Sequence, residues 1–361
     1  MGKSETATIK DVAKLAGVSI ATVSRVLNKL GVVNPETERK VLSAVAMLHY
    51  QRNAVARSLK LKVTKSIGIM VPEISNTFFT EIVEQLEHLL GPLGYALLVC
   101  SSENSVAEEK RKLSLLLERN VDGLVVIPVS DVGDHFCTPS LSNTPFVMID
   151  RKIEGLDCDI ILTDNRQGAY DVTSALIREG RKRIGFLGGD AHVHTSVERL
   201  HGYLEAMKDN HLEVEKQFIL LGGMTQKAGY TLMQQALAME QCPDAFFMVN
   251  DMVHIGATSY LMAHEGRQMH SRMAFAAFDY LYYAPLLQFC HYAVAQPLDL
   301  IGKSAARLLI RRMEGDRQGF PATIVLEPTI HAMKENGGIV TDGKSKASRY
   351  DHSPRFDKVF S

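Results

Sequence analysis

The sequence predicts a small all-α N-terminal domain followed by a larger α/β domain with two lobes. Residues 8–48 hold three short segments with helix-start and helix-stop residues and with apolar residues at helical spacing. From residue 66 onward, apolar strand-like runs alternate with amphipathic helical segments. The alternation continues over roughly 275 residues, which is too long for one compact core, so two α/β lobes are expected.

The first predicted helix follows Thr8 and runs to about Ala16. Asp11, three residues after Thr8, fits a variant of the capping box in which Asp replaces the usual Glu. Gly17 ends the helix, because glycine tolerates the left-handed conformation of a helix stop. Only residues 17–19 separate this helix from the next, a turn short enough to hold the two helices at a steep angle.

Ser19 caps the second predicted helix, which runs from Ile20 to about Asn28. Asn34 caps the third, with Pro35 at its first position, where the missing N–H costs nothing. Apolar side chains recur at helical spacing along all three segments and predict one small core. The predicted core residues are Val12, Ala13, Ala16, Val18, Val23, Leu27, Val41, Leu42, Val45 and Leu48.

Positive charge is concentrated in the N-terminal segment. Residues 1–65 contain 12 Lys and Arg against 4 Asp and Glu, a balance of +8. Since the whole chain carries −1, residues 66–361 carry about −9. Such asymmetry is typical of a segment that binds a polyanion. Together with the capped helices and the tight turn, it favours a DNA-binding domain over a helical bundle with a solvated basic face.

The larger domain begins at about Lys65. The run 66–72, SIGIMVP, is nearly all apolar, which is typical of a strand buried on both faces. Regular alternation of strands and helices predicts parallel sheets with right-handed crossovers. The further predicted strands are 95–100, 123–128, 146–150, 159–164, 183–189, 217–223, 245–251 and 273–279, and the predicted helices lie at about 78–90, 105–119, 165–179, 196–210, 225–239 and 252–265.

Residues 8–29, with the runs IKDVAKLAGVS and ATVSRVLN, resemble the helix-turn-helix signature of the lactose-repressor/galactose-repressor (LacI/GalR) family of bacterial transcription regulators. The resemblance extends to about residue 333. It implies an N-terminal all-α helix-turn-helix DNA-binding domain in residues 1–52 and a hinge helix with its linker in residues 53–64. Residues 65–334 would then form an α/β periplasmic-binding-protein-like (type I) two-lobed domain for effector binding and dimerisation.

In the fold of this family the chain crosses between the lobes three times, and we expect the crossings near residues 161–164, 289–293 and 322–326. Residues 335–361 are polar, contain Gly and Ser, and lack leucine heptads. This composition predicts a disordered tail and no C-terminal tetramer helix.

The second helix of a helix-turn-helix reaches base edges with its N-terminal residues. By resemblance, Ile20 and Ala21 fill the base-reading pair, and Arg25 is the reader one turn further on. Arg25 can pair with guanine through two hydrogen bonds, worth about 1–3 kcal/mol of discrimination. Ile20 and Ala21 can only contact a thymine methyl or exclude a base by shape. Other polar residues of the helix are better placed to contact DNA phosphates. These residues are Thr22, Ser24 and Asn28. For Thr22 and Ser24 the alternative is that they are ordinary polar residues on an exposed helix face.

Residues 53–60, NAVARSLK, form a short basic segment with Val55 and Leu59 on one apolar stripe. Eight residues are too few for a stable lone helix, so the segment should order only when something supports it. The resemblance assigns it as the hinge helix, which pairs with its dimer mate in the minor groove. Leu59 would wedge between base steps, flanked by Arg57 and Lys60. A flexible basic linker is the alternative.

Polar residues cluster at the carboxyl ends of the predicted strands, where open α/β sheets bind ligands. By resemblance, Arg199 in the run RLHGY takes the place of the effector-binding arginine and Phe79 that of a stacking aromatic. Carboxylates beside an arginine suit vicinal hydroxyls, and an aromatic can cover an apolar ring face. The candidate effector-binding residues are Asn76, Phe79, Asp150, Thr195, Arg199, Asn250, Asp279 and Gln296.

Five other residues leave alternatives open. Asp251 is favoured as a helix N-cap over a ligand contact, and Asp164 has the same two interpretations. Tyr280, Tyr282 and Tyr283 depart from the family pattern. They either enlarge an aromatic platform for a longer glycoside or, the slightly favoured interpretation, pack in the dimer interface or the core.

Other protein classes find little support. The chain has no Cys-x-x-Cys, His-Glu-x-x-His, Gly-x-Ser-x-Gly or phosphate loop, so we expect no enzyme and no cofactor. His192 and His194 are spaced as possible metal ligands, but no third ligand is evident, so no metal is predicted. Five scattered cysteines suit reduced thiols in a cytosolic protein. No apolar run reaches 18 residues and no signal peptide begins the chain, which predicts a cytoplasmic protein without membrane contact.

The sequence thus predicts a homodimeric transcriptional regulator that binds a pseudo-palindromic double-stranded operator. The favoured function is a repressor of carbohydrate-utilisation genes whose operator affinity a saccharide changes. The alternative within the class is a purine or nucleoside effector or corepressor. A solute-binding protein without a regulatory role is the less favoured class.

Overall fold

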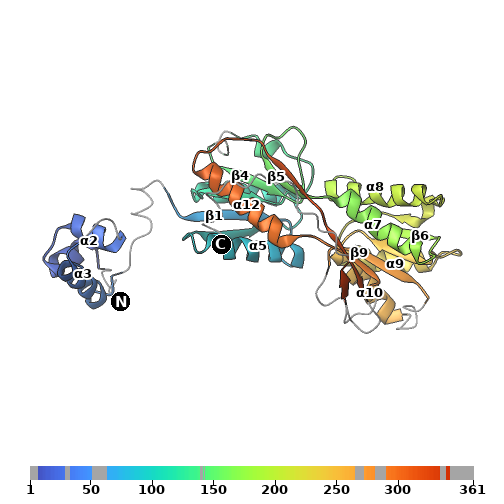
Figure 1. Ribbon diagram of the computed structural model, residues 1–361, viewed down its shortest axis with the longest axis horizontal. Coiled ribbons are helices and arrows are strands. Elements are labelled where there is room, and N and C mark those ends of the chain that lie inside the picture. The colour runs from blue at the N-terminus through green and yellow to red at the C-terminus, as the bar shows by residue number, and fades with distance from the viewer. Residues whose placement is uncertain are drawn as a thin grey trace. The chain divides into compact units, whose positions relative to one another are not determined.

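The computed structural model describes residues 7–28, 33–50, 63–138, 141, 143–264, 272–280, 290–333 and 339–341. The chain divides into two compact units, Met1–Thr64 and Lys65–Ser361. Each unit is described by itself, and the ribbon in Figure 1 labels the principal elements of both.

The first unit contains the helices α1 (Ile9–Ala16), α2 (Ile20–Asn28) and α3 (Pro35–Met47). Their boundaries follow the predicted stop and start residues. Gly17 adopts the left-handed conformation with φ 65°. The Ser19 hydroxyl accepts a hydrogen bond from the backbone N–H of Thr22 at 3.1 Å.

The other two predicted caps are present as well. The Asp11 carboxylate accepts hydrogen bonds from the backbone N–H and the hydroxyl of Thr8, at 2.8 and 2.7 Å. These bonds lower the pKa of Asp11. The Asn34 side chain accepts from Glu36 N at 2.8 Å, with Pro35 at the first helical position. Local sequence therefore determines where these helices begin.

Val12, Val23 and Val41 are fully buried at the centre of the first unit. The prediction that Leu42 belongs to this core is wrong, because its side chain is 49% exposed. On α3 the core face follows the spacing of Val41 and Ala44. Leu42 lies about 100° around the helix from Val41 and therefore faces away from the core.

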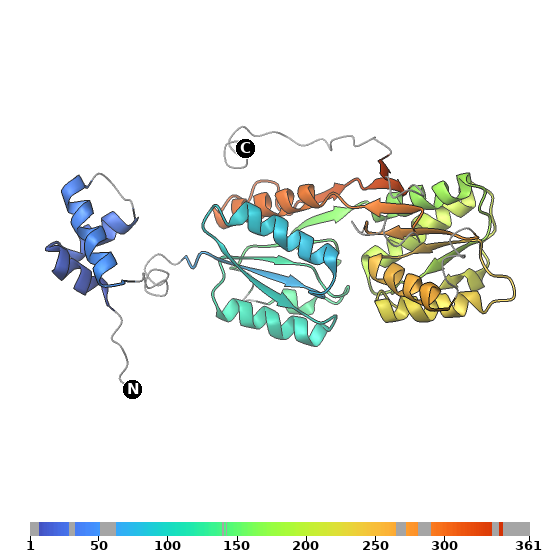
Figure 2. The same ribbon diagram turned by 90° about the horizontal axis from the view of Figure 1, so that it is seen from below.

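The second unit has two lobes, each built on one sheet with helices on both faces (Figures 1 and 2). All strand pairs in the six-stranded sheet of the first lobe are parallel. The strand order is β11-β5-β4-β3-β1-β2. The strands are β1 (Ser66–Val71), β2 (Ala96–Ser101), β3 (Gly123–Val126), β4 (Phe146–Ile149), β5 (Asp159–Thr163) and β11 (Thr323–Leu326).

Two helices, α5 (Thr77–Leu90) and α12 (Leu298–Met313), pack against one face of this sheet and against each other. Although far apart in the sequence, they lie side by side in Figures 1 and 2. The opposite face is covered by α6 (Val106–Glu118), with the 3-10 turn Asp134–Phe136 in the same core cluster. The apolar runs of the central strands β1, β3, β4 and β5 are buried on both faces, as parallel sheets require, whereas the edge strands β2 and β11 are partly exposed.

The sheet of the second lobe has seven strands in the order β13-β12-β10-β9-β8-β6-β7. Its central strands are parallel, whereas β12 pairs antiparallel with β10 and with β13. The strands are β6 (Ile184–Leu187), β7 (Ile219–Leu220), β8 (Ala245–Met248), β9 (Ala274–Phe278), β10 (Tyr292–Ala295), β12 (Thr329–Met333) and β13 (Ile339–Thr341).

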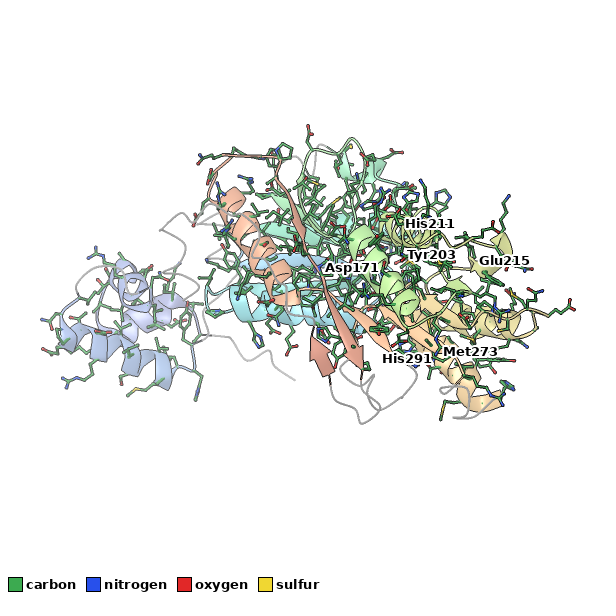
Figure 3. The ribbon with its side chains drawn as sticks, turned by 45° about the vertical axis from the view of Figure 1, so that its right-hand side comes forward. Asp171, Tyr203, His211, Glu215, Met273 and His291 are labelled. Carbon is green, nitrogen blue, oxygen red and sulfur yellow. The ribbon has the colours of Figure 1, made fainter. Side chains whose placement is uncertain are left out.

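Helices α7 and α8 pack as a pair in this lobe, and α9 and α10 form a second pair. Tyr203 of α8, labelled in Figure 3, is fully buried, and its hydroxyl donates to the carbonyl of Ile184 at 2.7 Å. It thereby satisfies a strand-end acceptor while its ring packs near Phe186. The helices are α7 (Asn165–Arg178), α8 (His194–Asp209), α9 (Gln226–Leu237) and α10 (Asp251–His264), with a 3-10 turn at Lys216–Phe218.

Three crossings join the lobes. The first follows β5 at residue 164, within the expected range. The second lies between β10 and α12, at residues 296–297, and the third between β11 and β12, at residues 327–328. The expected positions of the second and third crossings were therefore a few residues too early. The reason is that β10 and β11 complete their pairing within one lobe before the chain crosses.

The tail prediction also needs a correction. Residues 339–341, inside the segment expected to be disordered, form β13 and pair with β12. Composition missed this strand because Ile-Val-Thr is a short β-favouring run inside a polar segment, and sheet pairing is a long-range contact. The rest of 335–361 lies outside the described residues.

A buried ion pair holds α12 on the first lobe after the chain has crossed back. Arg312 donates to both carboxylate oxygens of Asp159, at 2.6 and 3.0 Å, and Ala322 N donates to the same carboxylate at 2.8 Å. Both charged side chains are almost fully buried.

We expect Arg312→Ala to lower the free energy of unfolding by about 3–5 kcal/mol, because it leaves the Asp159 charge buried without its cationic partner. Urea denaturation measures this. Lys303→Ala is the matched control, since its ion pair with Asp299 is exposed and should contribute less than about 1 kcal/mol. Equal losses for the two variants would contradict a special role for the buried pair.

Candidate functional site

One face of α2 is free for contact in the described part of the first unit. Ile20 is 45% exposed, and Ala21 and Arg25 are exposed on the same side. Val23 and Val26 on the opposite side are buried in the core. The N-terminal residues of α2 and the Arg25 side chain are therefore exposed on one face, as required of a helix that contacts bases in the DNA groove.

The polar residues of α2 are tied to one another. The hydroxyls of Ser19 and Thr22 lie 2.9 Å apart, and Asn28 Nδ2 donates to the Ser24 hydroxyl at 3.2 Å. Thr22 and Ser24 are half-buried, and Asn28 is exposed. These contacts hold the side chains in place, and their role at phosphates stays a prediction.

The hinge residues Arg57, Leu59 and Lys60 lie outside the described residues. Their assignment therefore stays a prediction from the sequence.

A cleft of about 370 Å³ lies between the two lobes of the second unit. Both lobes contribute the loops that follow their parallel strands, so the cleft lies where open α/β sheets bind ligands. Every predicted effector residue except Gln296 lines it. The lining residues include Glu73, Asn76, Phe79, Asp150, Arg151, Asp190, Thr195, Arg199, Met224, Asn250 and Asp279.

Asp150 and Asp279 occupy equivalent places in the two lobes. Asp150 directly follows β4 and Asp279 directly follows β9, and each has φ 68°. A left-handed conformation is uncommon outside glycine, although Asp tolerates it better than most residues. Both strands thus end by turning a carboxylate into the cleft wall. Burial raises the pKa of Asp150, opposed mainly by the positive charge of Arg151.

Arg199 projects from α8 and is 2% exposed. Its Nε donates to Asn165 Oδ1 at 2.8 Å, and its Nη1 donates to the carbonyl of Val249 at 2.7 Å and to Asp279 Oδ2 at 3.4 Å. The guanidinium carbon lies 3.6 Å from the ring centroid of Phe278. The predicted effector arginine is therefore held in one position by the protein itself.

Gln296 acts behind the cleft wall. Its Nε2 donates to Asp279 Oδ1 at 2.6 Å, and its Oε1 accepts from the Thr163 hydroxyl at 2.5 Å. Thr163 ends β5 at the first crossing and Gln296 lies at the second. The predicted contact residue therefore connects two crossing segments to the Asp279 carboxylate.

Asp251 requires a correction. Asn250, not Asp251, caps α10, because its side chain accepts from Val253 N at 2.9 Å. The Asp251 carboxylate accepts from the backbone N–H of the next residue, Met252, at 2.8 Å. It also accepts from Asn76 Nδ2 at 3.4 Å and from the Thr77 hydroxyl at 3.2 Å, both at the start of α5. Asp251 therefore joins the two lobes.

For Asp164 the N-cap interpretation is correct. Its carboxylate accepts from Gln167 N at 2.9 Å at the start of α7.

Tyr280 lies with the small cluster around Cys290 and Ala293, and its ring centroid is 4.9 Å from that of His331. This supports the core interpretation for Tyr280. Tyr282 and Tyr283 lie outside the described residues.

Two sequence profiles match this chain. Residues 8–53 match the profile described as bacterial regulatory proteins, lacI family. Residues 64–325 match periplasmic binding proteins and sugar binding domain of LacI family. The chain belongs to the LacI family.

Its curated relatives include the HTH-type transcriptional repressor PurR of Actinobacillus pleuropneumoniae serotype 5b (strain L20). The two are 34% identical over 329 residues, which are 90% of this chain and 96% of the relative. PurR of Haemophilus influenzae (strain PittEE) is 35% identical over 318 residues, 87% of this chain and 93% of the relative. This LacI-family chain is therefore a DNA-binding transcriptional repressor.

Solved structures share the fold. The Lac repressor dimer bound to operator and the anti-inducer ONPF has a TM-score of 0.81 at 22% identity, with 92% of this chain and 99% of that chain covered. The complex of the transcriptional regulator CelR with cellobiose has a TM-score of 0.67 at 27% identity, with 92% of this chain and all of that chain covered. The predicted fold class is confirmed.

The described residues contain neither a metal-binding cluster nor a helix able to span a membrane. No group of three or more His, Cys, Asp or Glu side chains is placed to hold a metal there, and His192 lies 3.8 Å from Asp131 at an exposed site. No helix in the described part of the chain is both long and apolar enough to span a membrane.

The burial of the Asp251 carboxyl predicts a pH dependence of stability. Burial and the nearby negative charge of Asp279 raise the pKa of Asp251 from 3.8 to about 7. The folded protein therefore binds this proton more tightly than the unfolded chain. The stabilisation is fully present below about pH 4 and is lost as the pH rises through 7.

We expect Asp251→Asn, which cannot ionise, to flatten the pH profile of unfolding. Its free energy of unfolding relative to wild type should grow by about 2–3 kcal/mol from pH 5 to pH 8. Urea titrations across this range measure the difference. Asp164→Asn is the control, because Asn is an equally good N-cap. Parallel profiles for Asp251→Asn and wild type would show that Asp251 is not the titrating group.

Proposed function

We propose that this chain is a homodimeric repressor that binds a pseudo-palindromic operator through α2 and is released by a saccharide in the interlobe cleft. The observation that carries the proposal is the cleft itself. Carboxylates from equivalent strand ends of both lobes converge there beside a fixed arginine. A ligand that contacts both lobes changes the lobe geometry by its differential affinity for the two states.

The chemistry of the cleft supports a saccharide. Asp150 and Asp279 supply acceptors and Arg199 supplies donors, so vicinal hydroxyls find both kinds of partner. Phe79 offers an apolar surface for a ring face. The related CelR structure is a complex with cellobiose, which fits the same class.

A purine or nucleoside effector is the second candidate. It is favoured by the PurR repressors, which align with most of this chain. A purine ring also carries donors, acceptors and a flat apolar face, so the same cleft residues suit it.

The proposed switch works through the hinge. Residues 53–60 of two subunits would pair in the minor groove only when the lobes hold them close together. An effector that favours another lobe geometry would lower operator affinity, and a corepressor would raise it by the same linkage. We propose that the repressor acts in the bacterial cytoplasm and that dimerisation supplies two half-sites and two hinges.

Arg25→Ala should relax operator specificity. The variant loses the α2 side chain able to pair with guanine through two hydrogen bonds, so discrimination at one base pair should fall by about 1–3 kcal/mol. Fluorescence anisotropy with operator variants measures this. Arg39→Ala is the control, since Arg39 is an exposed cation of α3 and its loss should weaken all sequences about equally. If Arg25→Ala discriminates as well as wild type, Arg25 does not read bases.

A thermal-shift screen of neutral saccharides, nucleobases and nucleosides tests the effector class. A ligand that binds the folded state raises Tm, and the same ligand should change operator affinity in the anisotropy assay. A saccharide that stabilises and releases the protein from DNA supports the first candidate, whereas a nucleobase or nucleoside doing so supports the second. Stabilisation without any change in operator affinity would contradict the effector role of the cleft.

A further inference from the structure

Four charged side chains meet at the centre of the cleft: Asp150, Arg151, Arg199 and Asp279. We infer that the cleft selects an uncharged effector and rejects phosphorylated or carboxylated forms of the same molecule. The inference rests on the proposed function, in which the cleft is the effector site. It holds for a saccharide and for a nucleobase or nucleoside alike.

The positive charge of Arg151 is compensated by the protein. Its Nη1 donates to the carbonyls of Pro128 and Val129, at 2.9 and 2.7 Å. Its Nε lies 3.4 Å from Asp150 Oδ2. The Arg151 side chain is only 9% exposed, so little water screens these contacts. An arginine held in this way positions the cleft wall and offers little uncompensated charge to an anion.

A second carboxylate lies behind Arg151. Glu109 of α6 is fully buried, and its Oε2 accepts from Val129 N at 2.7 Å. Its Oε1 lies 2.7 Å from His135 Nε2. Glu109 therefore holds the loop whose carbonyls bind Arg151, and its charge acts on Arg151 as well. Two acidic groups, Asp150 and Glu109, thus face one guanidinium.

Arg199 is compensated in the other lobe. Two of its nitrogens are engaged by Asn165, the carbonyl of Val249 and the carboxylate of Asp279. The Phe278 ring covers one face of the guanidinium. Both arginines therefore enter the cleft already paired, in contrast to an anion site, where a free guanidinium fork awaits the ligand.

The whole cleft surface is acidic. Glu73 and Asp190 join the two central carboxylates, so four carboxylates and two guanidiniums line the cleft, a formal charge of −2. Lysine is absent from these lining residues. A phosphate or carboxylate would lose its hydration and meet net repulsion, whereas an uncharged ligand loses little.

The unmet hydrogen-bonding capacity points the same way. Asp150 Oδ1 and Arg151 Nε are both buried, and neither has a hydrogen-bond partner within the described residues. The Asp150 oxygen needs a donor, which a ligand hydroxyl or N–H supplies and a fully ionised phosphate monoester group does not.

Inorganic phosphate tests the inference without knowledge of the effector. Wild-type Tm should not rise in millimolar sodium phosphate relative to sodium chloride of equal ionic strength. Asp150→Asn keeps the side-chain shape and removes the charge that faces both arginines. This variant should gain a phosphate-dependent rise in Tm. Asp299→Asn, on the exposed face of α12, is the control and should behave as wild type.

Matched ligand pairs extend the test to organic anions. Glucose is compared with glucose 6-phosphate and glucuronate, cellobiose with its phosphate, and adenosine with adenosine 5′-monophosphate. In each pair that binds, the uncharged member should bind at least tenfold more tightly by calorimetry.

The inference is overturned if phosphate stabilises wild type, if Asp150→Asn folds yet gains no phosphate response, or if an anionic member binds better than its parent. A phosphorylated ligand that releases the operator would overturn the charge selectivity and keep the proposed function. An uncharged ligand that binds without changing operator affinity would contradict the proposed function and leave the charge selectivity standing.

Discussion

The organisation of the second unit depends on one hydrogen-bonded chain of side chains: Thr163, Gln296, Asp279 and Arg199. It starts at the first crossing, passes through the second and ends at the arginine of α8. The Asp279 carboxylate accepts hydrogen bonds from both Gln296 and Arg199, and the left-handed backbone at Asp279, directly after β9, places it between them. The segments that join the lobes are therefore linked to the wall of the cleft, so a ligand that displaces Asp279 acts on the crossings directly.

The two lobes also meet outside this chain of side chains, where Asp251 accepts hydrogen bonds from Asn76 and Thr77. A buried carboxylate near a second one is costly, because burial and the neighbouring negative charge both disfavour its ionised form. The cleft wall is arranged similarly, with its arginines paired before any ligand arrives. Charge compensation within the protein is the basis of our proposal that the cleft binds its ligand by hydrogen bonding and ring contact.

Much of the fold could be predicted because its signals are local. Thr8, Gly17, Ser19 and Asn34 mark helix ends through contacts within a few residues, and buried parallel strands appear as apolar runs. The resemblance placed Arg199 and Asp279 at the cleft. The failures involve distant contacts: Leu42 faces solvent although its spacing is helical, and β13 depends on a strand partner.

The sequence by itself determined the helix boundaries of the first unit, the order of β1 to β9 along the chain and the residue types at the ends of those strands. It did not predict β10, β11, β12 or α12. Only the tertiary structure decided their partners. Asp251 looks like a helix cap in the sequence, yet it contacts the other lobe. Two backbone carbonyls and a nearby carboxylate surround Arg151, and none of these contacts could be predicted from its neighbours in the sequence. Helix caps depend on neighbours in the sequence, whereas the charge state and the free hydrogen-bonding capacity of a cleft depend on groups that only folding brings together.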